Sequence, residues 1–459
     1  MILPFGLLLA MIALAPLFFS TWWGKHYIKI AVGLAAVMVL YYFFGLGAKG
    51  RIVETAHNYI SFIVFIGALF VVSGGIHIRV KGEATPMANV MFLATGAFAA
   101  NLLGTTGASM LLIRPWIRMN RHRITGYHVV FFIFIISNVG GCLTPVGDPP
   151  LFIGYLMGVP FWWVTKQCWP MWLTGAGVLL AMFYVLDLRN YKQASKNVRD
   201  HLTAHEEWRF DGLHNLIFLA VIFGAVFIER IPFLREALML GAAFASYHFT
   251  HDTVHESNEF TFHPVKEVAV LFLGIFATMM PALDWLQANA RLFGSPTPTL
   301  MYFGSGALSS VLDNAPTYWS FLSASIATLV NPDTVTSVKS IIAAGGAHAV
   351  AGTDVSQTLA VLQQYHPIEL AANNLTTEHI QVANLLGNPS SKLYVIAVTI
   401  GSVFFGANTY IGNGPNFMVK AIADQQKVTT PDFLTYIFKY TLPFMAPMLL
   451  LVWWLFFSH

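Results

Sequence analysis

The sequence predicts an all-α polytopic membrane protein with about eleven transmembrane elements. We expect two inverted repeats, each with a re-entrant hairpin and a broken helix. The 459 residues are 56% hydrophobic and only 10% charged, whereas soluble domains carry about 25% charged residues. Apolar blocks recur along the chain, and several reach the roughly 20 residues that a helix needs to cross a bilayer. Shorter apolar segments stand beside glycine and proline, a pattern typical of hairpins and discontinuous helices.

Charged residues between the apolar blocks predict the orientation. Basic residues concentrate in two loops, Arg114–Arg123 and 189–212, and the positive-inside bias places both in the cytoplasm. Segment 331–391 is the longest polar stretch and has one basic residue, Lys339, against four acidic ones. We therefore expect it outside, with short amphipathic helices at 358–365 and 377–386. The predicted location is the bacterial inner membrane, crossed several times and with lipid as the main partner.

Short motifs recur in the same order in both halves, which favours an internal duplication. The first predicted hairpin leads into a cytoplasmic loop and the second into the outside segment. The halves are therefore predicted to be inverted, an architecture that supports alternating access around a site at the membrane midplane. The matching motifs are Phe65–Phe70 with Phe272–Phe276, Leu103–Gly107 with Leu312–Pro316, and Gly147–Pro150 with Gly412–Pro415.

These repeats define the expected organisation. Segments 1–57 and 213–265 are predicted scaffold helices, and 189–212 is the cytoplasmic loop between the halves. The first repeat, 58–188, contains a hairpin near 87–113 and a broken helix near 128–160. The second repeat, 266–457, contains a hairpin near 298–330, the extracytoplasmic insertion 331–391 and a broken helix near 393–424.

The stretch Ser137–Pro150 combines helix breakers, small polar residues and a carboxylate between apolar segments. Unpaired backbone in hydrocarbon is too costly for a lipid-facing span, so such a stretch is expected to line a polar cavity. Its counterpart in the second half is Gly406–Asn416, and each half adds a hairpin tip. Free carbonyls and side-chain oxygens at these four places suit sodium, the only ion or cofactor expected. Half-helix N-termini there would also suit an anion, so the sign of the substrate stays open.

The candidate cation- or substrate-binding residues come from the two tips and the two breaks. They are Gly104, Thr105, Thr106 and Gly107; Asn138, Gly140, Gly141, Thr144 and Gly147; Ser310, Asn314 and Thr317; and Asn408, Thr409, Gly412, Asn413 and Asn416.

Two carboxylates, Asp148 and Asp313, are the candidate proton or cation carriers. A carboxylate inside a membrane costs about 2.5–3.5 kcal/mol on insertion scales, so it is a functional candidate by default. A buried carboxylate holds a proton more readily, and a bound cation displaces that proton. The alternative is that each aspartate only caps a half-helix, which stabilises a helix by about 1 kcal/mol. The two roles are compatible.

The hairpin LSSVLDNAPT (Leu308–Thr317), the break SNVGGCLTPVGDPP (Ser137–Pro150) and the span FIVFIGALFVVSGG (Phe62–Gly75) resemble the ion-transporter superfamily. That superfamily includes arsenite permeases, NhaD-type sodium/proton antiporters, and citrate and dicarboxylate carriers. The resemblance covers roughly residues 28–457 without the insertion. It implies a dimerising scaffold, hence a homodimer, and a transport domain that moves like an elevator. It also places sodium-site motifs at the first tip with Asn138–Gly141, and at Asp313–Thr317 with Asn408–Asn413.

The chain departs from the superfamily pattern at two positions. The first tip reads Gly104–Gly107 without the Asp-Asn or Ser-Asn-Thr of many relatives, and Asn413 stands where the first break has Asp148. Carboxylate carriers generally have Ser-Asn-Thr at both sites, and neither tip matches.

The leading hypothesis is a sodium/proton antiporter with alternating access. The alternatives are a sodium- or proton-coupled symporter of citrate or a dicarboxylate, then an arsenite or oxyanion permease, and last a ligand-sensing receptor. No nucleophile–base pair or metal cluster stands out in the sequence, so an enzyme is disfavoured. A nucleic-acid partner is disfavoured because the basic loops lie between membrane segments.

Overall fold

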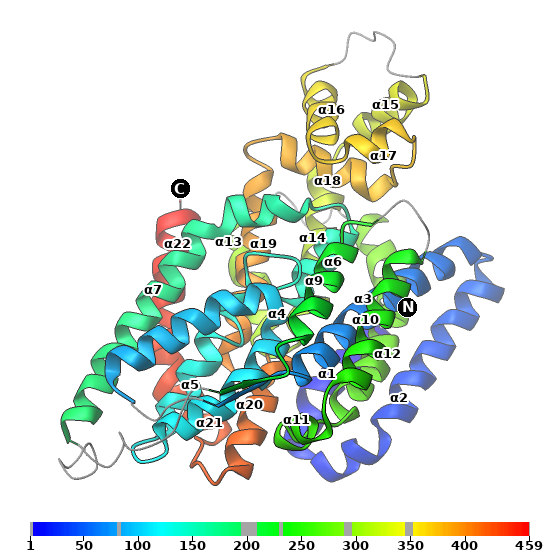
Figure 1. Cartoon of the computed structure of the whole chain (residues 1–459). Helices are drawn as coiled ribbons and strands as arrows, with labels where there is room; N and C mark the ends of the chain where they lie inside the picture. Colours follow the sequence, from blue (N-terminus) through cyan, green and yellow to red (C-terminus); the bar gives the residue numbers. More distant parts are fainter. Residues whose placement is uncertain are drawn as a thin grey trace.

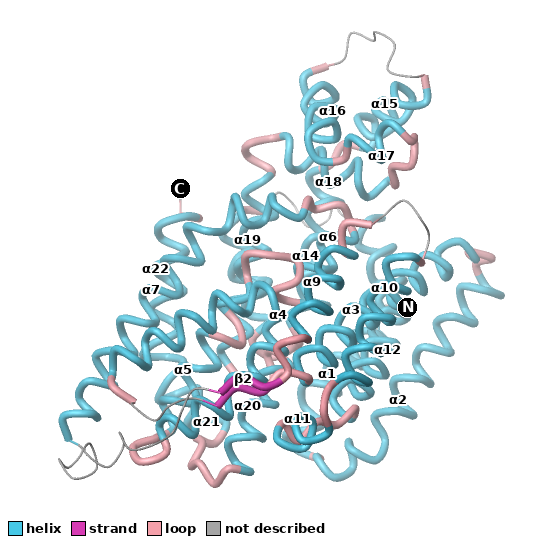
Figure 2. The backbone as a smooth tube through the Cα atoms, in the orientation of Figure 1, coloured by secondary structure: helices cyan, strands magenta, loops and turns pink. Residues whose placement is uncertain are grey.

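The computed structural model describes residues 3–79, 84–193, 209–228, 233–288, 296–344 and 352–458. Helices make up 81% of the structure (Figure 1). The one sheet in the described ranges pairs two three-residue strands, β1 (His77–Arg79) and β2 (Arg209–Asp211), antiparallel with His77 opposite Asp211 (Figure 2). The all-α prediction is thus confirmed. Most of the predicted loop 189–212 lies outside the described residues.

The helices follow one another in the order predicted from the apolar blocks. The first half contains α1 (Leu3–Phe18), α2 (Ser20–Leu40), the π-helix η1 (Tyr41–Gly45), α3 (Lys49–Gly74), α4 (Pro86–Asn120), α5 (Gly126–Ile135), η2 (Val139–Gly141), α6 (Pro149–Leu156) and α7 (Phe161–Gln193). Between the halves lie α9 (Asn215–Ala225), α10 (Leu234–Phe249) and α11 (Asp252–Ser257). The second half contains α12 (His263–Ala288), α13 (Pro298–Ser309), α14 (Asn314–Leu329), α15 (Pro332–Ala343), α16 (Thr353–Tyr365), α17 (Pro367–Ala371), α18 (Thr377–Gly387), α19 (Lys392–Phe405), η5 (Gly406–Asn408), α20 (Gly414–Gln425), α21 (Phe433–Tyr436), the π-helix η6 (Ile437–Met445) and α22 (Ala446–Phe456).

Six helices in the described part are long and apolar enough to cross a membrane, or seven if the bent pair α18–α19 counts as one span. The six include α4, which passes the length test because both arms of a hairpin are counted together. Several other predicted elements are hairpin arms or half-helices that are too short to pass it. The multi-pass character is therefore confirmed, and the total of about eleven elements stays a prediction.

The helix α4 is a hairpin, because its chain reverses at Gly104. Gly104 has φ 75° and ψ 152°, a non-helical conformation within the helix. Its two arms run side by side, since Asn89 and Asn120 near its ends exchange side-chain hydrogen bonds of 2.8 and 3.1 Å. A positive φ is the conformation that favours glycine. Gly104 therefore sets the tip of this hairpin.

The second hairpin is formed by α13 and α14, with its turn at Val311–Asp313. Phe321 of α14 lies against Gly304 of α13, where an added Cβ would come within 2.9 Å of the Phe321 ring. The absent Cβ lets the two arms approach closely. The tips of both hairpins reach the first break, since Thr105 and Asn314 both donate to Asp148.

The insertion forms a separate group of helices at one end of the molecule. α15, α16, α17 and α18 project beyond the bundle on the side where α22 and the C-terminus lie (Figure 1). The amphipathic segments 358–365 and 377–386 are helical, within α16 and α18. The predicted scaffold helices pack with the first helix of each repeat, because α12 contacts α1, α2 and α3, and α10 contacts α3 and α9.

Replacing Gly104 by alanine is expected to lower the free energy of unfolding by about 1–3 kcal/mol, because a non-glycine residue at positive φ is strained. The added Cβ would also meet the Val146 carbonyl oxygen at 3.3 Å. Thermal unfolding of the purified protein in detergent measures the effect. Gly177→Ala in α7 is the matched control, because no atom lies within 4 Å of its added Cβ and alanine favours a helix. Equal melting temperatures for the two variants would contradict the assigned role of Gly104.

Candidate functional site

Both hairpin tips and both breaks meet at the Asp148 carboxylate, which is 1% exposed. Thr105 of the first tip donates to Oδ1 over 2.8 Å, and Asn314 at the second tip donates to Oδ2 over 2.6 Å. The Asn413 amide from the second break lies 3.5 Å from Oδ1. Three neutral donors hold this buried carboxylate in place, and no lysine or arginine among the described residues pairs with it. The structure thus brings one predicted carrier and three predicted binding residues together.

The local sequence explains why the Asp148 side chain faces this centre. Pro149 and Pro150 occupy the first helical positions of α6, which need no backbone N–H bond, so the helix begins there. Asp148 is the N-cap residue, yet its side chain makes no capping hydrogen bond. The capping alternative therefore does not describe Asp148 in this structure, because its oxygens are taken up by the opposite elements.

Asp313 is placed differently. Its carboxylate accepts a hydrogen bond from the Ala315 backbone N–H over 3.1 Å, so it caps α14. The backbone N–H of Gly414, at the start of α20, also interacts with this carboxylate. Asp313 thus lies at the N-termini of two half-helices, where negative charge is favoured.

The two halves tie tip to break by the same hydrogen-bonding pattern. In the first half, Thr144 donates to the Asn101 carbonyl over 2.6 Å and accepts from the Gly147 N–H. In the second half, Thr409 donates to the Ser310 carbonyl over 2.6 Å and accepts from the Gly412 N–H. The residue after this glycine is an aspartate, Asp148, in the first half and an asparagine, Asn413, in the second. The centre therefore has a single carboxylate where the pattern offers two positions.

Asparagine side chains interlock the two breaks. The Asn413 amide donates to Asn138 Oδ1 over 3.2 Å and to the Ser137 carbonyl over 3.0 Å. The Asn138 amide donates to Asn416 Oδ1 over 2.8 Å, and the Asn416 amide donates to the carbonyls of Gly406 and Thr409. These side chains satisfy carbonyls that the broken helices leave free, as buried backbone groups require. The breaks therefore form one connected unit.

Glycines allow the close approach of backbone within each break. A Cβ on Gly141 would come within 2.7 Å of the Gly147 carbonyl oxygen, and one on Gly412 within 2.5 Å of the Gly406 carbonyl oxygen. Neither contact distance occurs for real Cβ atoms. The two breaks therefore fold back on themselves only with glycine at these positions.

Not all predicted site residues face the centre. Thr106 and Gly107 line a small cavity of about 20 Å³ against α3, together with Gly104. Thr317 donates to the Asp313 carbonyl within its own helix, and Asn408 donates to the Ser310 hydroxyl. The Gly140 carbonyl accepts from Asn101 over 2.7 Å. These residues contact other parts of the tips and breaks, and no hydrogen bond to Asp148 is found for them among the described residues.

Asn101 is a site residue that the prediction of binding residues missed. Besides its bond to Gly140, its Oδ1 accepts from the Leu143 N–H over 2.9 Å. A buried amide in the apolar arm of a hairpin, directly before the tip, is the sequence signal that could have identified it.

Two buried amide oxygens are available to a ligand. Oδ1 of Asn314, a fully buried side chain, and Oδ1 of Asn408 have no protein hydrogen-bond partner in the described part of the chain. Amide and carboxylate oxygens are ligands for hard cations, so Asn314 Oδ1 beside Asp148 is suited to a sodium ion. No group of three or more His, Cys, Asp or Glu side chains that would hold a transition metal occurs among the described residues.

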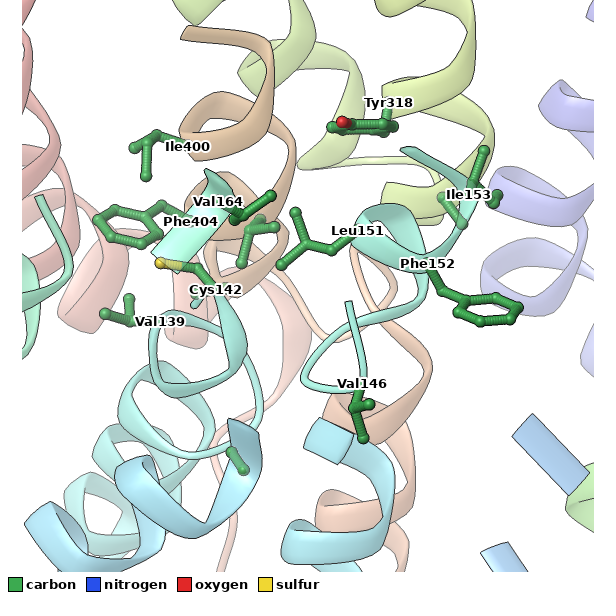
Figure 3. Close-up of a cluster of buried hydrophobic side chains, with 14 of the residues drawn as sticks. Val139, Cys142, Val146, Leu151, Phe152, Ile153, Val164, Tyr318, Ile400 and Phe404 are labelled. Atoms are coloured by element: carbon green, nitrogen blue, oxygen red, sulfur yellow. The ribbon is translucent and has the colours of Figure 1, made fainter. Parts of the chain in front are cut away.

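An apolar shell surrounds the first break. Leu151 of α6, Val164 of α7, and Ile400 and Phe404 of α19 lie around the break with Cys142 (Figure 3), and all are buried. Such a shell lowers the local dielectric, so a charge on Asp148 interacts strongly with anything that binds there.

A second buried carboxylate, Asp187 in α7, was also missed. It pairs with Arg123, whose Nη2 lies 2.7 Å from Oδ2, and with His128 over 3.0 Å. Asn89 and Tyr127 donate to the same carboxylate. A carboxylate within the apolar run of α7 was the available signal. Because Asp187 is ion-paired and connects α7 to the first arm of α4, to Arg123 after the second arm and to α5, we assign it to holding the base of the first hairpin.

Comparison with known proteins supplies one further finding. The family model described as "Putative citrate transport" matches residues 1–457, almost the whole chain. No curated protein matches the sequence.

Asp187→Asn is expected to lower the free energy of unfolding by about 3–5 kcal/mol, because it leaves the buried Arg123 guanidinium without its counter-charge. Asp424→Asn breaks the exposed pair with Lys420 and is the matched control, with an expected effect of about 0–1 kcal/mol. Thermal unfolding of both variants in detergent tests the difference. A melting temperature of Asp187→Asn as high as that of Asp424→Asn would show that the Asp187 network does not stabilise the hairpin.

Proposed function

Because the chain belongs to the citrate transport family whose model it matches, we propose that it is a secondary transporter that carries citrate or a similar carboxylate across the membrane. We propose further that sodium ions or protons drive this transport by binding at Asp148. The single observation that carries the coupling is the buried Asp148 carboxylate, where both tips and both breaks meet.

The arrangement favours a carboxylate substrate only when a cation is present. The half-helices α6, α14 and α20 begin at Pro149, Asn314 and Gly414, near the centre, and helix N-termini attract anions. The uncompensated charge of Asp148 repels an anion in the same low-dielectric space. A sodium ion or proton on Asp148 removes this repulsion. Substrate binding therefore requires the cation, which is the thermodynamic basis of coupled transport.

The family favours a carboxylate carrier over the sodium/proton antiporter that the sequence suggested first. The antiporter remains a second candidate for one reason. Asp148 makes no ion pair with a lysine or arginine in the described ranges, so sodium and protons would compete for it directly.

Uptake into proteoliposomes distinguishes the two functions. Radiolabelled citrate, with an inward gradient of sodium ions or of protons, tests the carrier, and a pH-sensitive dye trapped inside reports proton movement. Citrate accumulation that requires a cation gradient supports the carrier. Proton movement on adding sodium without citrate would instead establish the antiporter.

Asp148→Asn is expected to abolish gradient-driven citrate accumulation, because an amide cannot hold a proton or neutralise a cation. The amide is similar in size and can still pair with Thr105, so folding should persist. Proteoliposome uptake measures the effect, and Asp354→Asn on the exposed surface of α16 is the matched control with unchanged uptake. Cation-dependent accumulation by Asp148→Asn would exclude this residue as the coupling site.

The Asp313→Asn variant tests whether Asp313 only caps α14 or also contributes to cation binding. Asparagine caps a helix about as well as aspartate, so the melting temperature should stay within about 1 °C of the wild type, equivalent to a few tenths of a kcal/mol. If the negative charge of Asp313 contributes to cation binding, as we propose, the sodium or proton concentration for half-maximal uptake rises. An unchanged cation dependence in this folded variant would leave Asp313 with the capping role alone.

A further inference from the structure

A cavity of about 330 Å³ opens between the scaffold, the half-helices and the insertion. Its scaffold wall comes from the first turns of α3 and α10, including Arg51 and Arg235, and its base includes Tyr155 of α6 and Ser323 of α14. Its third wall comes from the insertion. We call this cavity the vestibule. Its volume falls in the range of small-molecule pockets.

The vestibule lies at the far ends of the half-helices that begin at the Asp148 centre. α6 has eight residues and is therefore about 12 Å long, with the centre at its start and the vestibule at its end. Stacked rings of Phe65 and Phe152, with centroids 3.9 Å apart, and the edge-on pair Phe276–Trp319 lie between scaffold and half-helices. The vestibule thus lies between the insertion side and the centre, and these aromatic rings separate the vestibule from the centre.

The insertion is attached to the outer end of α6. The His366 imidazole lies 3.2 Å from the Gly158 carbonyl oxygen, and its ring packs edge-on against His379, with centroids 5.1 Å apart. Gly158 has φ 101°, and an added Cβ would come within 2.9 Å of the His379 Cα. We call these three residues the clasp. It connects a segment of the second half to the helix that carries Asp148.

Charged side chains line two walls of the vestibule. Glu369 of α17 and Glu378 of α18 come from the insertion, whereas Arg51 and Arg235 come from the scaffold. The two arginines also pair with Glu54 and Glu236, so the scaffold wall is close to neutral and the insertion wall is acidic. No net charge on the scaffold wall therefore opposes an approach of the acidic insertion wall, and such an approach would close the cavity.

We propose that α17 and α18 form an outer lid that closes the vestibule when substrate occupies the Asp148 centre, with the clasp transmitting the position of α6 to the lid. This inference rests on the proposed function for the identity of the substrate. The lid itself follows from the vestibule, its two walls and the clasp. The closed lid would exclude water while the substrate passes the aromatic rings between the vestibule and the centre.

Labelling of a single cysteine from outside tests the lid. The native cysteines, both buried, are replaced by alanine, and Asn58→Cys places a thiol in the vestibule wall. Citrate in sodium-containing buffer is expected to slow its reaction with an impermeant maleimide about tenfold, a usual size for coupling between sites. Thr336→Cys, exposed on α15, is the control and should react at the same rate with and without citrate.

The clasp is tested in the same assay. In the clasp variant His366→Ala/His379→Ala, citrate should no longer protect the Asn58→Cys thiol. The control variant His248→Ala, on the exposed end of α10, should retain this protection.

A ligand-independent measurement separates the lid from the proposed function. His57→Cys and Ile368→Cys place one thiol on each wall of the vestibule, and oxidation should cross-link them when the lid closes transiently. His57→Cys with Thr336→Cys is the control pair and should not cross-link. Absence of the first cross-link, together with unchanged Asn58→Cys labelling in protein that citrate stabilises thermally, would overturn the lid. A cross-link in protein that neither binds nor transports citrate would leave the lid standing and refute the proposed function.

Discussion

The requirement that every backbone group inside a membrane find a partner determines the centre of this protein. Broken helices are tolerated in a bilayer only where other elements satisfy the freed carbonyl and amide groups. Here the partners are polar side chains of the tips and breaks themselves. Asn101 bonds Gly140 and Leu143, and Asn416 bonds Gly406 and Thr409. The scaffold, the hairpins and the apolar shell can be understood as the structure that keeps these four interruptions together.

The two halves place residues at equivalent positions of the centre, but the residues differ chemically. Thr144 and Thr409 play the same part in the two halves, and so do Thr105 and Asn314, which donate to the two oxygens of Asp148. The equivalence ends at Asp148 and Asn413, because only the aspartate can change its charge. The first half thus supplies the charged group, and both halves supply the neutral donors that orient it.

Much of this arrangement could be predicted from the sequence, because membranes impose simple rules. Apolar length identified the spans, and the glycine and proline runs identified both breaks and both tips. The side-chain partners could not be predicted, because pairing between segments hundreds of residues apart leaves no local pattern. The bonds of Asn138 to Asn416 and of Asn413 to Ser137 illustrate this limit. The ion pair of Asp187 with Arg123 is closer in sequence but likewise depends on how α7 packs against the first hairpin. For the same reason, the sequence alone could not distinguish Asp148, which faces the centre, from Asp313, which caps α14.

The interlocked asparagines have a consequence for how such a protein can change during evolution. Asn138 in one half and Asn413 and Asn416 in the other share each other's hydrogen bonds, so a substitution in one half leaves a buried group of the other unpaired. New substrate preferences would then require paired replacements, one in each half. The two halves are therefore constrained to change together.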